Sequence, residues 1–236
     1  MTPAKISLTT LLSTTILAQS AVVLTDDGHI YYDNADTVMN GGTAATMDLK
    51  RPGNSTNGSR KVYFRFDASG ETINPGDTAI LTFTTTGNSG GASFNINYGI
   101  YALNAPFAGT DLGIDWTEEA LTWNNAPGNS NNRGLDGANT TKLGGETGFS
   151  LNGSVQTISV SLSADDIANY VQNDDSITLI LLMESQSNTS PIVRIASKEN
   201  GNSAYHASLS IVPEPGVSLL AGLGMLGLLR RRRLGA

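Results

Sequence analysis

The chain has 236 residues, of which 39% are hydrophobic and 15% charged, and its formal net charge is −7. It contains no cysteine, which excludes disulfide bonds and thiolate metal sites. Lys5 and four terminal arginines account for five of the fourteen basic residues, and Glu214 for one of the twenty-one acidic residues, so residues 21–211 carry a formal charge of −11. So acidic a body disfavours nucleic acid and anionic membrane surfaces as partners.

The first twenty residues have the pattern of a secretory signal peptide. Lys5 gives a short positive start, residues 6–17 form a mildly apolar stretch, and residues 18–20 are Ala-Gln-Ser. Small residues at that point suit cleavage by a signal peptidase. We therefore expect residues 1–20 to be removed and the mature chain to start near Ala21. The alternative is that this stretch forms the first strand or helix of the fold.

The body of the chain alternates apolar and polar residues at the period of a β-strand. In a strand over 61–66, Val62, Phe64 and Phe66 would share one face, with Tyr63 and Arg65 on the other. A continuous apolar run over 177–183 is typical of a central strand that is covered on both faces. Further strands are expected over residues 79–84, 94–102, 156–162, 191–196 and 207–212.

One short helix is expected after the strand over 156–162. Ser163 is a suitable N-cap with Asp166 three residues later, and Ile167, Tyr170 and Val171 would form its apolar face. One short helix among seven or more strands predicts an all-β fold, a jelly-roll β-sandwich.

Two polar stretches, residues 51–60 and 124–146, are rich in Gly and Asn and are expected to form long loops. No internal repeat and no linker between domains is visible. We expect a single domain over residues 21–211, which is long enough to bury a sizeable core.

Four segments in chain order resemble the DNRLRE domain, which is also grouped with carbohydrate-binding module family 96. These are residues 34–38, 60–67, 116–127 (WTEEALTWNNAP), and 195–200 with 207–211. The resemblance covers roughly residues 26–212 and implies a β-jelly roll that binds polysaccharide as an accessory or surface module. The chain departs from the pattern at Ala207, where the family often has Pro, and in its extended loop over 51–60.

Aromatic side chains are the candidate sugar contacts, because a flat π-face matches the face of a pyranose ring. The candidates are Tyr63, Tyr101, Trp116 and Tyr205. An alternative applies to Trp116 and Trp123, whose spacing of seven suggests that both fasten a long loop onto the sandwich. Tyr98 is expected in the core.

Four acidic residues of the family-like segments are candidate calcium ligands, since calcium prefers carboxylate and carbonyl oxygens. They are Asp36, Asp67, Glu118 and Glu199. The alternative is that they cap turns or pair with Arg65 or Arg194. The expected function requires no cofactor, and calcium is the one cation that these residues suggest.

The sequence offers no convincing catalytic set. His29 and His206 are the only histidines and lack a metal-like spacing, and twenty acidic residues in the body make a pair of carboxylates uninformative. We therefore expect a non-enzymatic protein. A polysaccharide lyase or hydrolase, with Tyr205 and His206 as an acid/base pair, is the less favoured alternative.

The C-terminal segment combines three features in order. Pro213, Glu214 and Pro215 break the chain, residues 216–229 are apolar, and Arg230, Arg231, Arg232 and Arg233 follow. As a helix the apolar run would cover about 21 Å, less than the ~30 Å hydrocarbon core of a bilayer. A buried helix and a nucleic-acid-binding tail are both disfavoured, because the arginines directly follow an apolar run at the chain end.

This segment, residues 212–236, resembles the PEP-CTERM sorting signal with its transmembrane helix. The resemblance implies a precursor anchored transiently in the inner membrane and processed by an exosortase-type membrane protease. The body would then reach the cell surface or extracellular matrix. The expected function is thus an exported, non-catalytic polysaccharide-binding module. The alternative is a structural or adhesive matrix protein without sugar affinity.

Overall fold

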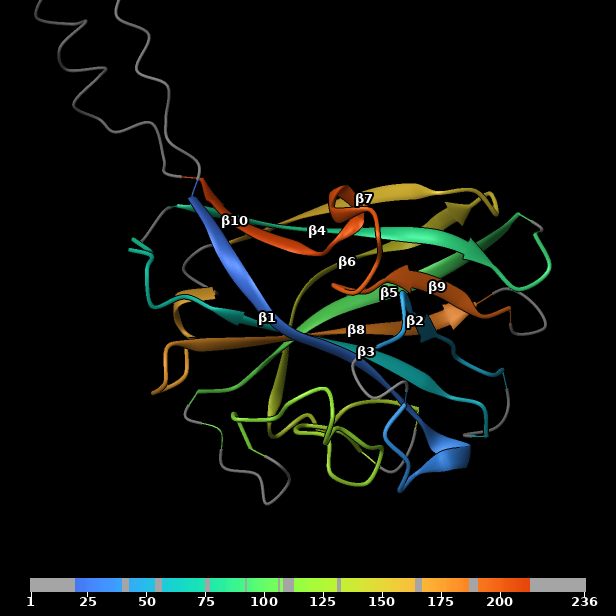
Figure 1. The fold of residues 1–236 in the computed structure, drawn as a ribbon, viewed down its shortest axis with the longest axis horizontal. Coiled ribbons are helices and arrows are strands. Elements are labelled where there is room, and N and C mark those ends of the chain that lie inside the picture. Colours follow the sequence, from blue (N-terminus) through green and yellow to red (C-terminus); the bar gives the residue numbers. More distant parts are fainter. Residues whose placement is uncertain are drawn as a thin grey trace, which may run out of the picture. The chain divides into compact units, whose positions relative to one another are not determined.

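Strand β1 (Ser20–Tyr31) connects the two antiparallel sheets of the domain (Figure 1). Its first residues, Ser20–Val22, pair with β10 (Ser208–Val212), and Val23–Tyr31 pair with β3 (Arg60–Asp67). A register shift between Leu24 and Asp26 lies close to the point where β1 changes its partner from β10 to β3. One strand therefore belongs to both layers and closes one side of the sandwich.

The computed structural model describes residues 20–39, 43–53, 57–74, 77–91, 93–105, 107, 113–130, 133–163, 167–186 and 191–212. Of the predicted signal peptide only Ser20, and of the predicted sorting segment only Val212, fall among these residues. In the described part of the chain, no helix has the length and apolar character needed to cross a bilayer.

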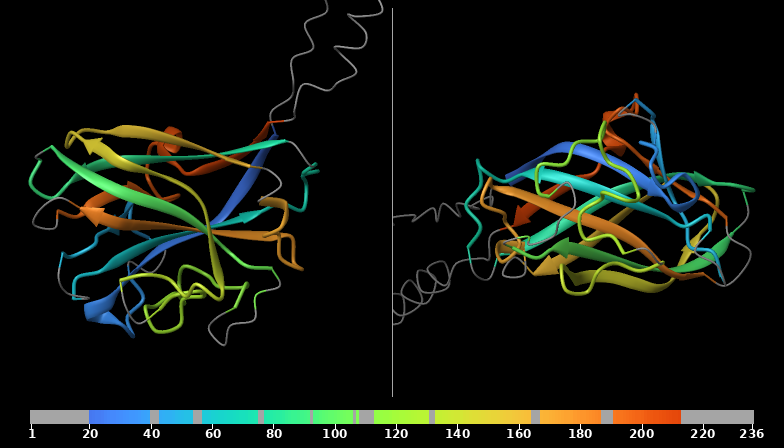
Figure 2. Two further views of the ribbon diagram at one scale, coloured as in Figure 1. Left: turned by 180° about the vertical axis from the view of Figure 1, so that it is seen from behind. Right: turned by 90° about the horizontal axis from the view of Figure 1, so that it is seen from below.

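In the first sheet, β4 (Thr78–Asn88) pairs along one edge with β7 (Gln156–Ser163). Its other edge pairs first with β10 and then, after Thr82, with β9 (Val193–Ala196), which in turn pairs with β2 (Thr46–Leu49). The second sheet has the order β1–β3–β8–β5–β6, in which β8 is Ser176–Gln186, β5 is Phe94–Leu103 and β6 is Thr140–Leu151. Figure 2 shows the same arrangement from two further sides.

The main core lies between the sheets and contains the predicted apolar face of β3, Val62, Phe64 and Phe66, each 0% exposed. Tyr98 also lies there, as predicted, with its ring edge-on to Phe83 at a centroid distance of 6.1 Å. Burial of aliphatic and aromatic surface of this extent is the main stabilising term in a domain that has no disulfide.

A second, smaller core covers the outer face of the second sheet. Its buried members are Ile30, Tyr63, Leu103, Trp116, Leu121, Trp123, Ala126 and Ile180. On β8, Leu179 and Leu181 point into the main core and Ile180 into the second one. This arrangement confirms the prediction of a central strand that is covered on both faces.

The prediction of an all-β fold is confirmed, while its finer assignment as a jelly roll remains a prediction. The expected helix after Ser163 is seen only in part: residues 164–166 lie outside the described residues, Ile167 and Ala168 are helical, and a turn follows. Ile167 is buried in the main core, and Tyr170 and Val171 pack against it, as their predicted face requires.

The expected loop over residues 124–146 is wrong for its last part, because β6 begins at Thr140. This edge strand lacks alternating hydrophobicity, and most of its side chains are exposed or half-buried. Its pairing with β5 instead depends on Gly145, whose φ is 137° and whose added Cβ would lie 2.1 Å from the carbonyl oxygen of Tyr98. Only glycine tolerates so close a backbone approach.

Candidate functional site

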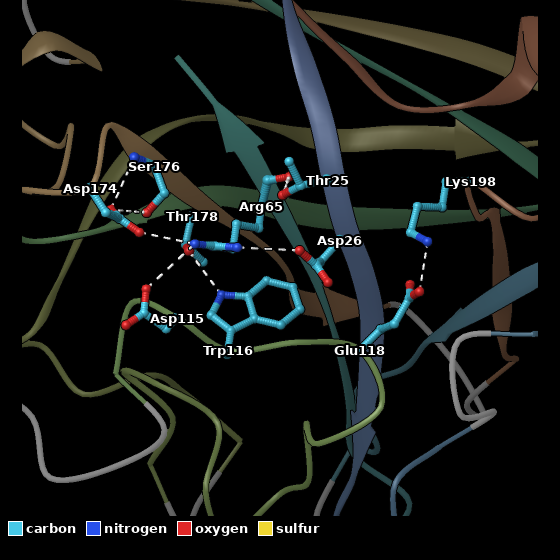
Figure 3. A network of polar contacts seen from close by, with 10 residues as sticks. All are labelled: Thr25, Asp26, Arg65, Asp115, Trp116, Glu118, Asp174, Ser176, Thr178 and Lys198. Atoms are coloured by element: carbon cyan, nitrogen blue, oxygen red, sulfur yellow. Dashed lines mark hydrogen bonds and ion pairs between the residues drawn. The ribbon is translucent and has the colours of Figure 1, made fainter. Parts of the chain in front are cut away.

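Residues 113–130 form a cover loop over the outer face of the second sheet, and Trp116 anchors it. The indole is 0% exposed and lies edge-on to Tyr63 at a centroid distance of 5.9 Å. Its Nε1 donates a hydrogen bond to Oγ1 of Thr178 on β8 at 2.9 Å (Figure 3). Trp123 is likewise 1% exposed. Both tryptophans therefore fasten the loop, as the alternative reading of their spacing predicted.

The burial of Trp116 and Tyr63 corrects their assignment as sugar contacts. Each ring is 0% exposed and therefore offers no face to a ligand. Tyr101 is half-buried, and its hydroxyl donates to Oε1 of Glu184 at 2.6 Å. Tyr205 lies in the short 3-10 helix η3 (Ser203–Tyr205) between β9 and β10. The four predicted sugar contacts thus do not converge on one site.

Arg65 connects the first residues of the cover loop to the second sheet. Its guanidinium lies 2.9 Å from Asp174, 3.4 Å from Asp26 and 3.7 Å from Asp115 (Figure 3). Three carboxylates from three separate segments thus share one planar cation, a geometry that guanidinium groups suit. Arg65 lies on the outer face of β3 as predicted, but it pairs with acidic residues other than the four candidates.

The four predicted calcium ligands lie in three places. Asp36 is exposed and accepts a hydrogen bond from Nδ2 of Asn124 at 2.6 Å. Asp67 is also exposed and accepts from the backbone N–H of Ser69 at 2.9 Å, and this bond lowers its pKa. Both therefore have the structural role that the alternative predicted. Glu118 and Glu199 do come together.

An acidic cluster forms where Glu118 and Glu199 meet Asp27 of β1. One oxygen atom from each of the three carboxylates lies within 4.8 Å of the others. The ammonium of Lys198 bridges two of them, at 2.6 Å from Glu118 and 2.7 Å from Glu199 (Figure 3 shows the first pair). The backbone N–H of Lys198 donates to Oδ2 of Asp27 at 2.8 Å.

Burial shapes the charge state of this cluster. Asp27 is 3% exposed, and desolvation, with smaller contributions from Glu199 and Glu118, raises its pKa to about 7. Burial also raises the pKa of Glu118, although the ion pair with Lys198 acts in the opposite direction. The pKa of Lys198 is raised because its hydrogen bonds to Glu118 and Glu199 outweigh its desolvation. The cluster is therefore a compact site of unbalanced negative charge.

A polar groove lies on the solvent side of the cover loop, beside the 3-10 helix η1 (Tyr32–Asn34). It consists of two depressions, of about 420 and 640 Å³, that share Trp123 and Asn124. The remaining lining residues of the two depressions are Tyr32, Asp33, Ala35, Asn57, Ala126, Asn129, Ser130, Leu135, Asp136 and Gly137. The backbone N–H of Asn124 donates to the carbonyl of Ala35 at 3.1 Å, which joins the two walls.

Lys61 supports the groove from below. Its side chain rises from β3 into the second core, where it is 1% exposed, and its ammonium bonds to Oδ1 of Asn129 at 2.5 Å and to the carbonyl of Gly134. The amide of Asn129 in turn donates to the carbonyl of Trp123 at 2.6 Å. Burial, with a smaller contribution from Arg51, lowers the pKa of Lys61 to about 7.

Residues 87–91 read Gly-Asn-Ser-Gly-Gly, which has the spacing of a nucleophile elbow. They span the end of β4 and the turn before β5, and not the strand-to-helix turn that such an elbow needs. Oγ of Ser89 accepts a hydrogen bond from the backbone N–H of Ile192 at 2.8 Å. This serine therefore has a structural role at the edge of the first sheet.

Sequence reasoning missed Asp27, Lys198 and the groove residues Tyr32 and Asn124. Asp27 lies in β1, a strand that was not predicted, so nothing in the sequence indicated that its side chain would be buried. Asn124 and Lys198 do fall in the family-like segments, which is the one signal that could have singled them out. No sequence pattern relates Asp27 to Glu118, because 91 positions separate them.

Residues 212–233 match the PEP-CTERM protein-sorting motif. The match includes Pro213, Glu214, Pro215 and the four arginines 230–233, and it indicates an exported protein that an exosortase, a membrane protease, sorts to the cell surface. No curated protein matches the chain. Among solved structures, the K1 cleaved adhesin domain of Lys-gingipain from Porphyromonas gingivalis W83 is similar at 11% identity and a TM-score of 0.33. That alignment covers 82% of this chain and 96% of that domain, and a likeness at this level does not bear on function.

Proposed function

We propose that the body of this exported protein binds a polysaccharide without cleaving it, at the groove between η1 and the cover loop. The observation that carries the proposal is the composition of this groove, in which Tyr32 lines one depression with Asp33 and Asn124, and Asp136 lines the adjoining depression. Planar polar side chains beside an aromatic ring suit a ligand with many hydroxyl groups. The resemblance to the DNRLRE domain supports the same class of ligand.

The aromatic wall of the groove is held rigidly. Tyr32 lies edge-on to Trp123, with ring centroids 5.3 Å apart and an interplanar angle of 88°. Trp123 is fully buried and keeps Tyr32 in place, while Tyr32 itself is half-buried and lines the groove. A pre-positioned ring loses little conformational entropy when a sugar stacks on it.

The charge of the groove favours a neutral polysaccharide. Its described lining includes the carboxylates of Asp33 and Asp136 and no lysine or arginine. The formal charge of −11 over residues 21–211 adds to the repulsion that an acidic glycan would meet. We therefore assign neutral glycans, with hydroxyl groups as their main polar contacts, as the ligand class.

The same carboxylates serve the loops that carry them. Asp33 accepts from the backbone N–H of Gly58 at 2.9 Å, and Asp136 accepts from that of Ala138 at 2.9 Å. Each carboxylate is thereby held in a fixed position, which suits it as a polar contact for a bound sugar.

Affinity electrophoresis of the full chain through gels that contain neutral or acidic polysaccharides tests the proposal. Retardation by a neutral glycan is expected, and Tyr32→Ala and Asn124→Ala should each weaken it about tenfold, since one stacking or hydrogen-bonding contact contributes roughly 1–2 kcal/mol. Tyr205→Ala is the matched control, because Tyr205 is a partly exposed tyrosine outside the groove. It should leave the affinity unchanged.

Three outcomes would count against the proposal. Absence of retardation by every glycan would leave a structural or adhesive matrix protein as the better account. Release of reducing ends or of unsaturated products would show an enzyme instead. Equal loss of affinity in Tyr205→Ala and Tyr32→Ala would place the binding site elsewhere on the domain.

A further inference from the structure

The acidic cluster joins three segments that are distant in the sequence. Asp27 lies in β1, Glu118 in the cover loop, and Glu199 in the connection between β9 and β10. Asp27 is 3% exposed and Glu118 is 6% exposed, so bulk water solvates neither carboxylate well. Burial of an ionised carboxylate is costly unless a cation or hydrogen-bond donors compensate it.

The donors present in the described part of the chain do not satisfy this need. Oδ2 of Asp27 and Oε1 of Glu118 accept hydrogen bonds from Lys198, and the backbone N–H of Asp27 also stabilises the charge of Glu118. Oδ1 of Asp27 and Oε2 of Glu118 are buried, and no described residue donates to either with hydrogen-bond geometry. Buried polar atoms in native proteins are nearly always paired with protein, water or an ion. A proton held by Asp27 or a bound cation would satisfy two such oxygens in one cluster of three carboxylates.

The space beside Asp27 is small. A cavity of about 10 Å³ adjoins Asp27 and Glu199 but not Glu118, and its lining also includes His29, Met47 and Ser197. This volume is at the lower limit for one water molecule or one ion. The cavity therefore has room for a single small ligand, which the carboxylates of Asp27 and Glu199 would contact.

From this arrangement we propose that Asp27, Glu118 and Glu199 bind one divalent cation, and that it is calcium. When a cation displaces the proton from Asp27, the three carboxylates and one ammonium leave two unbalanced negative charges, which a divalent ion neutralises. An all-carboxylate ligand set favours a hard cation over zinc or copper. Calcium accepts irregular oxygen geometry, whereas magnesium demands a near-ideal octahedron.

Bound calcium would connect the cover loop to both layers of the sandwich. Glu118 lies two residues from the anchor Trp116 and five residues from the groove residue Trp123. A cation between Glu118, Asp27 and Glu199 would tie the loop to β1 and to the β9–β10 connection. The site is separate from the groove, and the inference does not depend on sugar binding.

Titration of the chelator-stripped full chain with calcium chloride alone tests the site. Calorimetry should show one ion bound per chain, with a Kd of about 10⁻³ M or lower, the range of extracellular calcium modules. Calcium at about ten times Kd should raise Tm by roughly 3–6 °C. Asp27→Asn and Glu199→Gln should each reduce the affinity at least about tenfold. Glu199 is partly exposed, so its substitution perturbs the fold less.

Two further variants make the test selective. Asp36→Asn and Asp67→Asn remove exposed carboxylates outside the cluster and should leave calcium binding unchanged. Lys198→Gln removes the competing ammonium and should increase the affinity, by roughly tenfold or more, a gain that misfolding cannot produce. No binding heat and no shift in Tm with calcium would overturn the proposal. Unchanged affinity in folded Glu199→Gln, or equal loss in Asp67→Asn, would also overturn it.

Discussion

The ammonium of Lys61 lies over the ring of Trp123, 4.3 Å from its centroid, inside the second core. A lysine on β3 thus supports the wall of the groove through a cation–π contact and through hydrogen bonds to the segment after Trp123. The contact shows how the outer face of the second sheet positions a loop that has little regular structure of its own.

Lys61 should make the stability of the domain depend on pH. Its pKa is about 7 in the folded chain and about 10.4 in an unfolded one, so the unfolded state binds the extra proton between these values. The free energy of unfolding should therefore rise between pH 7 and 9.5, by at most about 1.4 kcal/mol per pH unit. Below pH 7 Lys61 is protonated in both states, so its contribution to the pH dependence should disappear there. Urea denaturation across this range should show the rise in the wild type and lose it in Lys61→Met. Lys142→Met, at a largely exposed lysine, should retain it.

Thr178→Val tests the anchor of the cover loop. The substitution keeps the shape of the side chain but leaves the buried Nε1–H of Trp116 without its acceptor. The free energy of unfolding should fall by about 1–3 kcal/mol, the usual cost of an unsatisfied buried donor. Thr82→Val removes a hydroxyl whose partner, Ser159, is also near solvent, so it should cost less than about 0.5 kcal/mol. Equal costs for the two variants would contradict the anchoring role.

Gly145→Ala should disrupt the pairing of β6 with β5. An added Cβ would lie 2.1 Å from the carbonyl oxygen of Tyr98, so the backbone must move, at a cost of about 2–4 kcal/mol. Gly70→Ala is the matched control, since nothing lies within 4 Å of its added Cβ. Thermal denaturation should show a large drop in Tm for the first variant and almost none for the second.

Replacement of Pro213, Glu214 and Pro215 by alanine tests the role of the sorting motif. Because the motif match covers these residues, the variant should escape exosortase processing and retain its apolar segment. Intact mass spectrometry of protein from the native host should then find a heavier chain in the membrane fraction. In a host that lacks the exosortase, the wild-type chain should stay unprocessed and differ in mass from the variant only by the three substitutions. Identical masses for the wild type in both hosts would contradict processing at this segment.

The residues alone predicted most of the strands because each strand carries its own signal. Val62, Phe64 and Phe66 alternate with polar neighbours, and a strand that alternates in this way must face a core on one side. The terminal motif was equally legible, since its three features are contiguous. The strands that were missed, β1, β2 and β6, are short, polar or adjacent to an expected signal peptide, and β6 depends on its pairing with β5.

The sequence by itself determined the all-β class and the sorting segment, because local periodicity and contiguous motifs carry that information. It left two readings of Trp116, and the burial of the indole in the structure decided for the role of loop anchor. Only the tertiary structure decided which acidic residues meet. It brought Asp27 to Glu118 and Glu199, left Asp36 and Asp67 apart from them, and placed the groove beside Tyr32. Such contacts join strands and loops across the sandwich, and no pattern along the chain specifies which of its many carboxylates will be buried together.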